Sequence, residues 1–255
     1  MSKPRISRRR FLTRALSITG AGLLAGCDGL SRTDWVPRLL ASAEGVTQRL
    51  QRLFTARRAL APEYTAADLS PVFPANGNDN PDNPAYQALA QQHFVGWKLA
   101  ISGLVQQPAD FSLAELRQLP ARTQITRHDC VEGWSAIAKW TGVELSTLLR
   151  HVQPRPVARY VVFFCADPDE EGQYYYESID FEDAYHPQTI LAYEMNDAPL
   201  PIAHGAPIRL RLERQLGYKM AKYVMRIELV DSFARIAGGR GGYWEDQGYE
   251  WYAGI

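Results

Sequence analysis

Two stretches of sequence decide the fold: Ile208-Arg209-Leu210-Arg211-Leu212 and Tyr223-Val224-Met225-Arg226-Ile227-Glu228-Leu229-Val230. Apolar and polar side chains alternate along both, which is typical of a β-strand with one buried face. In the first stretch the arginines are expected to point away from the apolar face. In the second, the odd-numbered residues are expected to face the core. The sequence therefore predicts paired strands in this half of the chain.

Residues 71–255 are expected to form one β-rich domain of the α+β class, with a mixed or barrel-like sheet. Pro, Gly and Asn are dense in residues 71–84, which predicts an irregular loop. Three further strands are expected in segments rich in β-branched and aromatic residues, Lys98–Val105, Thr123–Arg127 and Tyr160–Ala166. Short helices are expected at Ser112–Leu119, which opens on a capping box, at Glu144–Val152 and at Phe181–Tyr185.

Residues 1–26 have the features of an export signal. Ser7-Arg8-Arg9-Arg10-Phe11-Leu12-Thr13 is a twin-arginine pattern, and the apolar stretch after it is shorter than the roughly 20 residues of a transmembrane helix. Leu24-Ala25-Gly26-Cys27 resembles a lipoprotein cleavage box, which would make Cys27 the lipidated first residue of the mature chain. The sequence predicts a lipoprotein that is exported by the twin-arginine route to the periplasmic face of the membrane. A basic surface helix is the alternative.

The formal net charge of zero is the sum of two unlike parts. The chain has 28 basic and 28 acidic residues, but residues 1–26 contain six of the basic ones and no acid. The remainder therefore has a net charge of about −6, the opposite of what a phosphate-binding surface needs, and nucleic-acid binding is not expected. A hydrophobic content of 46% excludes intrinsic disorder, and three cysteines are too few for a disulfide-stapled scaffold.

Residues 27–70 are expected to form a helical linker arm. From Trp35 to Arg58, apolar residues recur at spacings of three and four, as on one face of an amphipathic helix, and the other side is basic. The helix could pack on the domain, or lie at lipid headgroups or against a membrane partner.

Several common catalytic motifs are missing from the sequence. The five histidines show no zinc-binding spacing, and no G-x-S-x-G elbow occurs. The glycine-rich run 238–242 lacks the Lys-Ser/Thr of a phosphate loop and is expected to be a surface loop. A zinc- or thiol-based hydrolase is therefore only a residual hypothesis.

Cys130 follows a predicted strand in the polar loop Arg127-His128-Asp129-Cys130-Val131-Glu132-Gly133-Trp134-Ser135. A thiolate there suits a soft or redox-active metal, but a reactive nucleophile and an ordinary buried cysteine are equally compatible with the residues alone. Cys165 lies in an apolar run and reads as a small core residue, although a disulfide with Cys130 is a further possibility in an oxidising compartment.

A second constellation is rich in cations. It combines His204-Gly205-Ala206-Pro207-Ile208-Arg209 with Gly217-Tyr218-Lys219-Met220-Ala221-Lys222. Arg and Lys that converge with a His suit a bound phosphate or another anion. A surface strand with scattered cations is the alternative.

Together, these constellations resemble the sulfite-oxidase-type molybdopterin oxidoreductases, and in particular the bacterial branch of the periplasmic protein-methionine-sulfoxide reductase catalytic subunit. The resemblance covers roughly residues 71–230 and rests on the segment from Cys130 to Ser135, the segment from His204 to Arg209, and their order with Lys222. It implies the fold of that family, with molybdopterin as the cofactor.

The resemblance also implies roles for individual residues. Cys130 would be the one protein thiolate on molybdenum, and the pterin and its phosphate would be held by residues at the matching family positions, Asn76, Cys165, His204, Arg209, Met220, Ala221 and Lys222. Cys165 stands where the family often has Thr. His204 matches the sulfite oxidases rather than the reductases, and Asp129 stands where the reductases have Arg. We expect Arg127, His128 and Asp129 to act near the metal or the substrate.

The reaction implied is a two-electron oxygen-atom transfer at molybdenum, on a sulfoxide-like or sulfite-like substrate that is small or protein-bound. The sequence has no C-x-x-C-H heme motif and no cysteine cluster, so the resemblance implies a separate electron-transfer partner, either a membrane heme protein or a periplasmic cytochrome. A non-catalytic cofactor-binding or assembly lipoprotein of the same fold is the alternative. The aromatic residues after 242 are expected to pack over the domain's own surface, with a role at the active-site mouth or a partner interface as the alternative.

Overall fold

The computed structural model describes residues 35–54 and 56–255, with side chains from residue 45 onward. The chain divides into two compact units, residues 1–51 and 52–255. The predicted signal segment and Cys27 lie outside the described residues. The helix expected from Trp35 to Arg58 is present as α2 (Trp35–Phe54), which ends before the expected limit.

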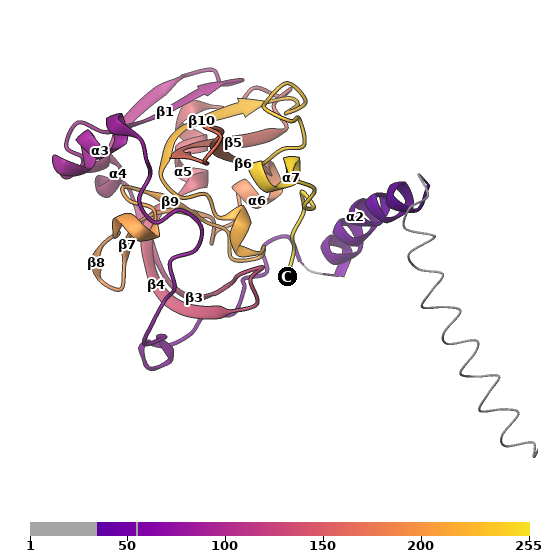
Figure 1. The fold of residues 1–255 in the computed structure, drawn as a ribbon, viewed down its shortest axis with the longest axis horizontal. Coiled ribbons are helices and arrows are strands. Elements are labelled where there is room, and N and C mark those ends of the chain that lie inside the picture. Colours follow the sequence, from indigo (N-terminus) through magenta and orange to yellow (C-terminus); the bar gives the residue numbers. More distant parts are fainter. Residues whose placement is uncertain (1–34, 55) are drawn as a thin grey trace, which may run out of the picture. The chain divides into compact units, whose positions relative to one another are not determined.

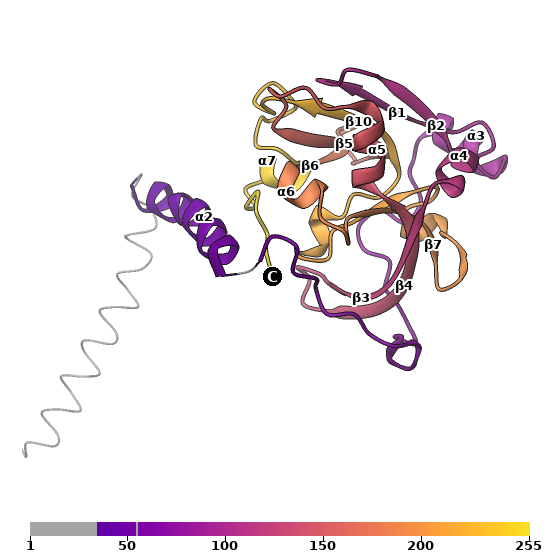
Figure 2. The same ribbon diagram turned by 180° about the vertical axis from the view of Figure 1, so that it is seen from behind.

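The second unit is built on two five-stranded sheets (Figures 1 and 2). The first has the order β2-β1-β10-β5-β6, with the bounds Ala109–Ser112, Lys98–Gly103, Val224–Val230, Tyr160–Pro168 and Tyr174–Asp180. The second has the order β3-β4-β7-β8 with β9 paired to β7, and its bounds are Ala121–Asp129, Ser135–Glu144, Ile190–Met195, Ala198–Pro199 and Arg209–Arg211. In both views, β3 and β4 lie on the opposite side of this unit from β1 and β10.

The expected β-rich α+β domain is confirmed, and each of the predicted strands is present as β1, β3, β5, β9 or β10. Strands β1 and β10 pair in parallel, with Ile101 opposite Ile227, and the other ladders are antiparallel. The sequence patterns did not predict β2, β4, β6, β7 and β8. In β4 the buried positions begin with the alanines 136 and 138, which have low β propensity, and β7 is buried on nearly every residue and so shows no alternation.

Short helices connect the strands: α3 (Pro84–Gln91), α4 (Leu113–Gln118), α5 (Leu145–Val152), α6 (Phe181–Ala184), α7 (Tyr243–Asp246) and the 3₁₀ turns Ala66–Asp68, Ile202–His204 and Gly217–Lys219. The three predicted helices are confirmed as α4, α5 and α6. The capping box of α4 is formed, since the Ser112 hydroxyl accepts from the Glu115 N–H at 3.2 Å and the Glu115 carboxylate accepts from the Ser112 N–H at 2.7 Å. No described helix is both long and apolar enough to cross a membrane.

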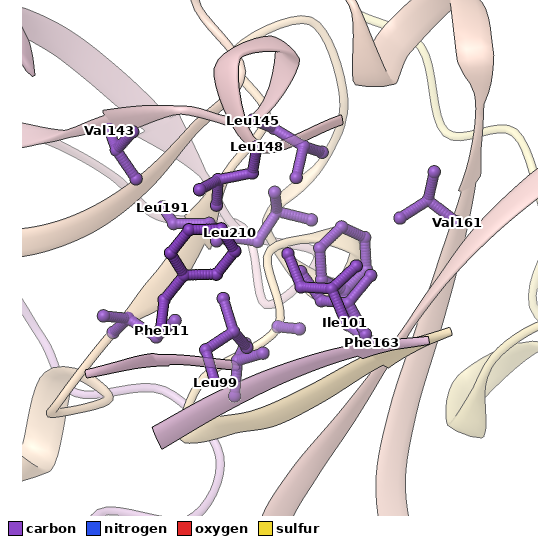
Figure 3. Close-up of a cluster of buried hydrophobic side chains, with 14 of the residues drawn as sticks. Leu99, Ile101, Phe111, Val143, Leu145, Leu148, Val161, Phe163, Leu191 and Leu210 are labelled. Carbon is purple, nitrogen blue, oxygen red and sulfur yellow. The ribbon is translucent and has the colours of Figure 1, made fainter. Parts of the chain in front are cut away.

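The main apolar core lies between the sheets. Figure 3 shows Leu99 and Ile101 of β1 and Phe163 of β5 grouped with Leu148 of α5 and Leu210 of β9. All five side chains are at most 1% exposed. Because β9 contributes Leu210 to this core, its arginines must extend to the other side of the strand, where the candidate site lies.

Candidate functional site

A cavity of about 420 Å³ contains four of the predicted site residues, Asn76, Cys130, Met220 and Lys222. They come from segments far apart in sequence: the irregular loop before α3, the end of β3 and the turn before β10. The tertiary structure therefore brings the cysteine-bearing segment and the cation-bearing segment to the same cavity.

Cys130 is held in a tight turn at the tip of the β3–β4 hairpin. Its N–H donates to the Trp134 carbonyl at 3.0 Å, and the Gly133 N–H donates to the Cys130 carbonyl at 3.1 Å. Gly133 has φ +89°, a left-handed conformation that glycine adopts without strain. The thiol is buried, and burial raises its pKa. Cys130 and Cys165 are both free, so the possible disulfide between them is not formed.

The cations of β9 and the turn after it are buried, so they do not form a surface strand. Arg209, Arg211 and Lys219 are 0% exposed and Lys222 is 7% exposed. The ring of Trp140 supports the two arginines, with the Arg209 and Arg211 guanidinium carbons 5.1 Å and 4.4 Å from the ring centre. Arg211 is neutralised by a buried salt bridge to Glu213 at 2.6 Å.

Arg209 and Lys222 form no salt bridge within the described part of the chain, and their hydrogen-bond partners are backbone carbonyls. Arg209 donates to the His204 carbonyl at 3.1 Å, and Lys222 donates to the carbonyls of Asn76 at 2.7 Å and Ala203 at 3.0 Å, and to that of Asn78. Two buried positive charges thus converge without a countercharge in direct contact.

Burial, and secondly the proximity of like charges, lowers the pKa values of the cations in this cluster. Burial lowers the pKa of Arg209 to about 9, with further lowering by the charge of Arg211. Burial and the charge of Arg209 lower the pKa of Lys222 to about 7, and burial with both cations lowers the pKa of His204 to about 4. A bound anion would relieve this repulsion, as expected for an anion-binding site.

Buried polar atoms without a partner occur on the cavity lining, at Asn76 and Asp167, and among the predicted site residues outside it. Asn76 Oδ1, His204 Nδ1, Arg209 Nε, His128 Nε2 and Asp167 Oδ1 are buried and have no hydrogen-bond partner. Buried polar groups are rarely left unpaired in folded proteins, so this concentration indicates a polar ligand. A phosphate-bearing pterin supplies an anion for the cations and both donors and acceptors for the neutral groups, and the residues therefore fit molybdopterin.

The three residues before Cys130 do not line the cavity. His128 is fully buried, and its Nδ1 lies 3.1 Å from Arg211 Nη1 and 3.3 Å from Met220 Sδ. Burial lowers the pKa of His128 far below 6.5. Arg127 and Asp129 form a salt bridge with each other at 2.9 Å. Because Arg127 compensates the charge of Asp129, this carboxylate is not the main source of negative potential at the cavity.

Of the other predicted cofactor residues, Cys165, His204, Arg209 and Ala221 lie outside the cavity lining. Cys165 is buried on β5 opposite Val224, and burial raises its pKa well above the ordinary value. Ala221 accepts the Leu210 N–H at 2.8 Å and so fixes the turn to β9. These residues stand behind the lining rather than on it.

Several cavity residues were not among the predicted site residues, although a position of the aromatic tail at the active-site mouth was the alternative expectation. Asp167, Tyr175 and three aromatic residues of the tail, Tyr243, Trp244 and Tyr249, all line the cavity. The main expectation for the tail, packing on the domain's own surface, is therefore incomplete, because this part of it faces the Cys130 cavity. The available signal was the high density of aromatic residues after 242.

No cluster of three or more His, Cys, Asp or Glu side chains placed to hold a metal ion occurs among the described residues.

Residues 87–235 match the family described as "Oxidoreductase molybdopterin binding domain". The chain is 38% identical, over 97% of its length and 88% of the relative, to the "Putative protein-methionine-sulfoxide reductase subunit YedZ1" of Azospira oryzae. It is 30% identical, over 76% of its length and 68% of the relative, to the "Protein-methionine-sulfoxide reductase catalytic subunit MsrP" of Ralstonia nicotianae. Among solved structures, the sulfane dehydrogenase SoxCD of Paracoccus pantotrophus is 24% identical with a TM-score of 0.49, and the match covers 54% of this chain and 39% of that one.

Proposed function

The chain belongs to the family of oxidoreductases with a molybdopterin-binding domain, and we propose that within this family it acts as an exported sulfoxide reductase. The observation that carries the proposal is that one free cysteine, Cys130, shares a cavity with Lys222, whose ammonium feels the charge of the buried Arg209 outside the lining. A thiolate suits molybdenum, and the paired cations suit the phosphate of its pterin.

Each part of the site has a defined role in this proposal. Cys130 would be the protein ligand of the metal. Lys222, with Arg209 and His204 buried near it, would hold the pterin phosphate, and the unpaired Asn76 Oδ1 would accept a hydrogen bond from the pterin. When bound, the molybdenum cofactor would supply the two-electron change that oxygen-atom transfer requires. The tight turn at Gly133 fixes the position of the Cys130 backbone.

The direction we favour is reduction. A sulfoxide takes up two electrons and two protons, its S=O bond breaks, and a thioether and water leave. Two relatives with at least 30% identity are named as protein-methionine-sulfoxide reductase subunits, which supports this substrate class. The carboxylates of Glu132, Asp169 and Glu170 at the cavity also favour an uncharged sulfoxide over sulfite.

The electrons must come from outside the chain. A separate electron-transfer partner is consistent with the two relatives, which are both named as subunits, and a heme protein would supply the electrons. Export by the twin-arginine route and lipidation at Cys27 would place the enzyme at the periplasmic face of the membrane, beside a membrane heme protein or a periplasmic cytochrome.

The proposal is tested by metal analysis and pterin fluorescence of protein purified from a host that makes the cofactor. We expect one molybdenum per chain, lost in Cys130→Ser and kept in Thr123→Ser, a matched change on the exposed side of β3. With a reduced viologen dye, the wild type should reduce sulfoxides. Protein without molybdenum and pterin would refute the assignment, and loaded protein that turns over no sulfoxide, N-oxide or sulfite would favour a non-catalytic binding protein.

A further inference from the structure

One wall of the Cys130 cavity comes from the tail segment, residues 238–255, which follows the matched family domain. Trp244 and Tyr249 are 37% and 42% exposed, and their rings stack with centroids 5.2 Å apart at 28°. Both line the cavity that contains Cys130. Large aromatic faces are thus open to solvent at the mouth of the proposed active site.

The wall is continuous with the sheet. Tyr243 stacks on Tyr175 of β6, with ring centroids 5.5 Å apart, and its hydroxyl donates to Asp169 Oδ2 at 2.8 Å. Tyr175, Tyr243 and Asp169 also line the cavity. Tyr249 packs edge-on against Tyr218, which precedes the turn to Lys222. The aromatic surface therefore runs from β6 across the tail segment to the cofactor side of the cavity.

The tail segment is anchored, so its rings have fixed positions. Glu245 of α7 is 1% exposed and pairs with the buried ammonium of Lys219. Asp246 accepts from the Tyr176 hydroxyl at 2.6 Å and from the N–H groups of Gly238 and Arg240 at 2.9 and 3.0 Å. The glycine-rich run is thus an ordered turn around Asp246. An aromatic wall held from both sides is pre-organised for a ligand.

Acidic side chains outnumber cations on the cavity lining. Glu132, Asp169 and Glu170 line it together with Asp167, whose pKa burial raises to about 7, and the cation on the lining is Lys222. With the cofactor phosphate bound, Lys222 would be neutralised and the carboxylates would dominate. Such a site repels an oxoanion, whereas an uncharged organic sulfoxide can place its apolar substituents on aromatic rings.

We propose that Trp244 and Tyr249 are specificity-determining residues that bind the apolar substituents of an uncharged sulfoxide, while Glu132 and Glu170 at the same mouth disfavour oxoanions. This inference rests on the proposed sulfoxide reductase function. The aromatic pair acts on substrate binding and takes no part in holding the cofactor.

The test compares two sulfoxides that differ in apolar surface, methyl p-tolyl sulfoxide and dimethyl sulfoxide, with holoenzyme and a reduced viologen dye. In Trp244→Ala and Tyr249→Ala, KM for the tolyl compound should rise about 3- to 10-fold, as for loss of an aromatic contact. Three quantities should stay within about two-fold of the wild-type values: kcat, the kcat/KM for dimethyl sulfoxide, and the molybdenum content. Trp244→Phe should restore most of the affinity. Tyr174→Ala removes an exposed tyrosine of β6 outside the cavity and serves as the matched control.

A second arm tests the carboxylates. In Glu132→Gln/Glu170→Gln, inhibition by sulfite should strengthen about 3-fold at low ionic strength and return to the wild-type value in 0.5 M salt, because salt screens exposed charges.

The outcomes separate the two proposals. A loaded wild-type enzyme that reduces neither sulfoxide overturns the proposed function itself. An enzyme that reduces both, but in which Trp244→Ala affects the two sulfoxides equally or lowers the molybdenum content, overturns the specificity role. An unchanged sulfite inhibition in the double variant overturns the role of the carboxylates.

Discussion

Replacing Lys219 with methionine tests what anchors the tail segment. The Lys219 ammonium lies between the carboxylates of Glu177 and Glu245, and the three side chains are at most 1% exposed. Methionine keeps most of the apolar volume but removes the charge. Two carboxyl groups are then left in the core without a cation, and Glu177 Oε2 and Glu245 Oε2 already have no hydrogen-bond partner.

The magnitude follows from this burial. Removal of one partner from a buried ion pair destabilises a protein by about 3–5 kcal/mol, because the remaining charge is not compensated. For a domain of this size we expect the melting temperature to fall by about 6–20 °C. Trp251 lies 5.4 Å from the Lys219 ammonium, so its indole environment should change as well.

The loss should depend on pH in a defined direction. Burial raises the pKa of Glu177 well above its ordinary value even in the presence of the ammonium, and removal of Lys219 raises it further. A carboxyl group with a raised pKa binds protons in the folded state that the unfolded chain has released. The contribution of Glu177 to stability is therefore fully present below its unfolded pKa of about 4.3, and it is lost as pH rises toward the folded pKa. The deficit of Lys219→Met should thus be largest at pH 8 and shrink toward pH 5.

The assay is urea unfolding followed by tryptophan fluorescence at pH 5 and pH 8, on preparations with equal molybdenum content because bound cofactor also stabilises the fold. The triple variant Lys219→Met/Glu177→Gln/Glu245→Gln is the matched control and should recover much of the loss at pH 8, since it has no buried charge. A deficit below about 1 kcal/mol, or one that is the same at both pH values, would refute a charged anchor.

Three further predictions concern other parts of the second unit. Arg209→Met should abolish molybdenum retention. It should nevertheless stabilise the cofactor-free protein by about 1–3 kcal/mol in urea unfolding, because it removes a buried cation that has no salt bridge, and a lower stability would contradict this. Burial lowers the pKa of His186 to about 4, so its contribution to stability, up to about 3 kcal/mol, is present above pH 6.5 and is lost as pH falls toward 4. His186→Gln should therefore make the free energy of unfolding less dependent on pH in this range. Gly142→Ala in β4 places a Cβ 2.6 Å from the Ala192 Cα and should lower stability by about 1–3 kcal/mol. The control Gly96→Ala makes only an ordinary 3.8 Å contact with Leu89 and should be near neutral, so equal melting curves for the two variants would contradict the prediction.

Local patterns identified many of the elements because their physical signals are short-range. The alternation in 223–230 and the capping box of Ser112 and Glu115 operate over a few residues, and β10 and α4 lie where they indicated. Strand β7 escaped prediction because both of its faces are buried by distant parts of the chain, which removes the periodic signal.

The candidate cysteine, the cation-bearing segments and the α+β class follow from the order of residues alone, because residue type indicates metal and anion chemistry and alternation indicates strands. The burial of Arg209 beside Trp140, rather than its exposure on an edge, depends on the folded chain. So does the cavity that Asn76, Cys130 and Lys222 share. The tertiary structure also decided that Arg127 neutralises Asp129, and that Trp244 faces the Cys130 cavity. Burial and charge compensation depend on neighbours distant in sequence, so they exist only once the chain has folded.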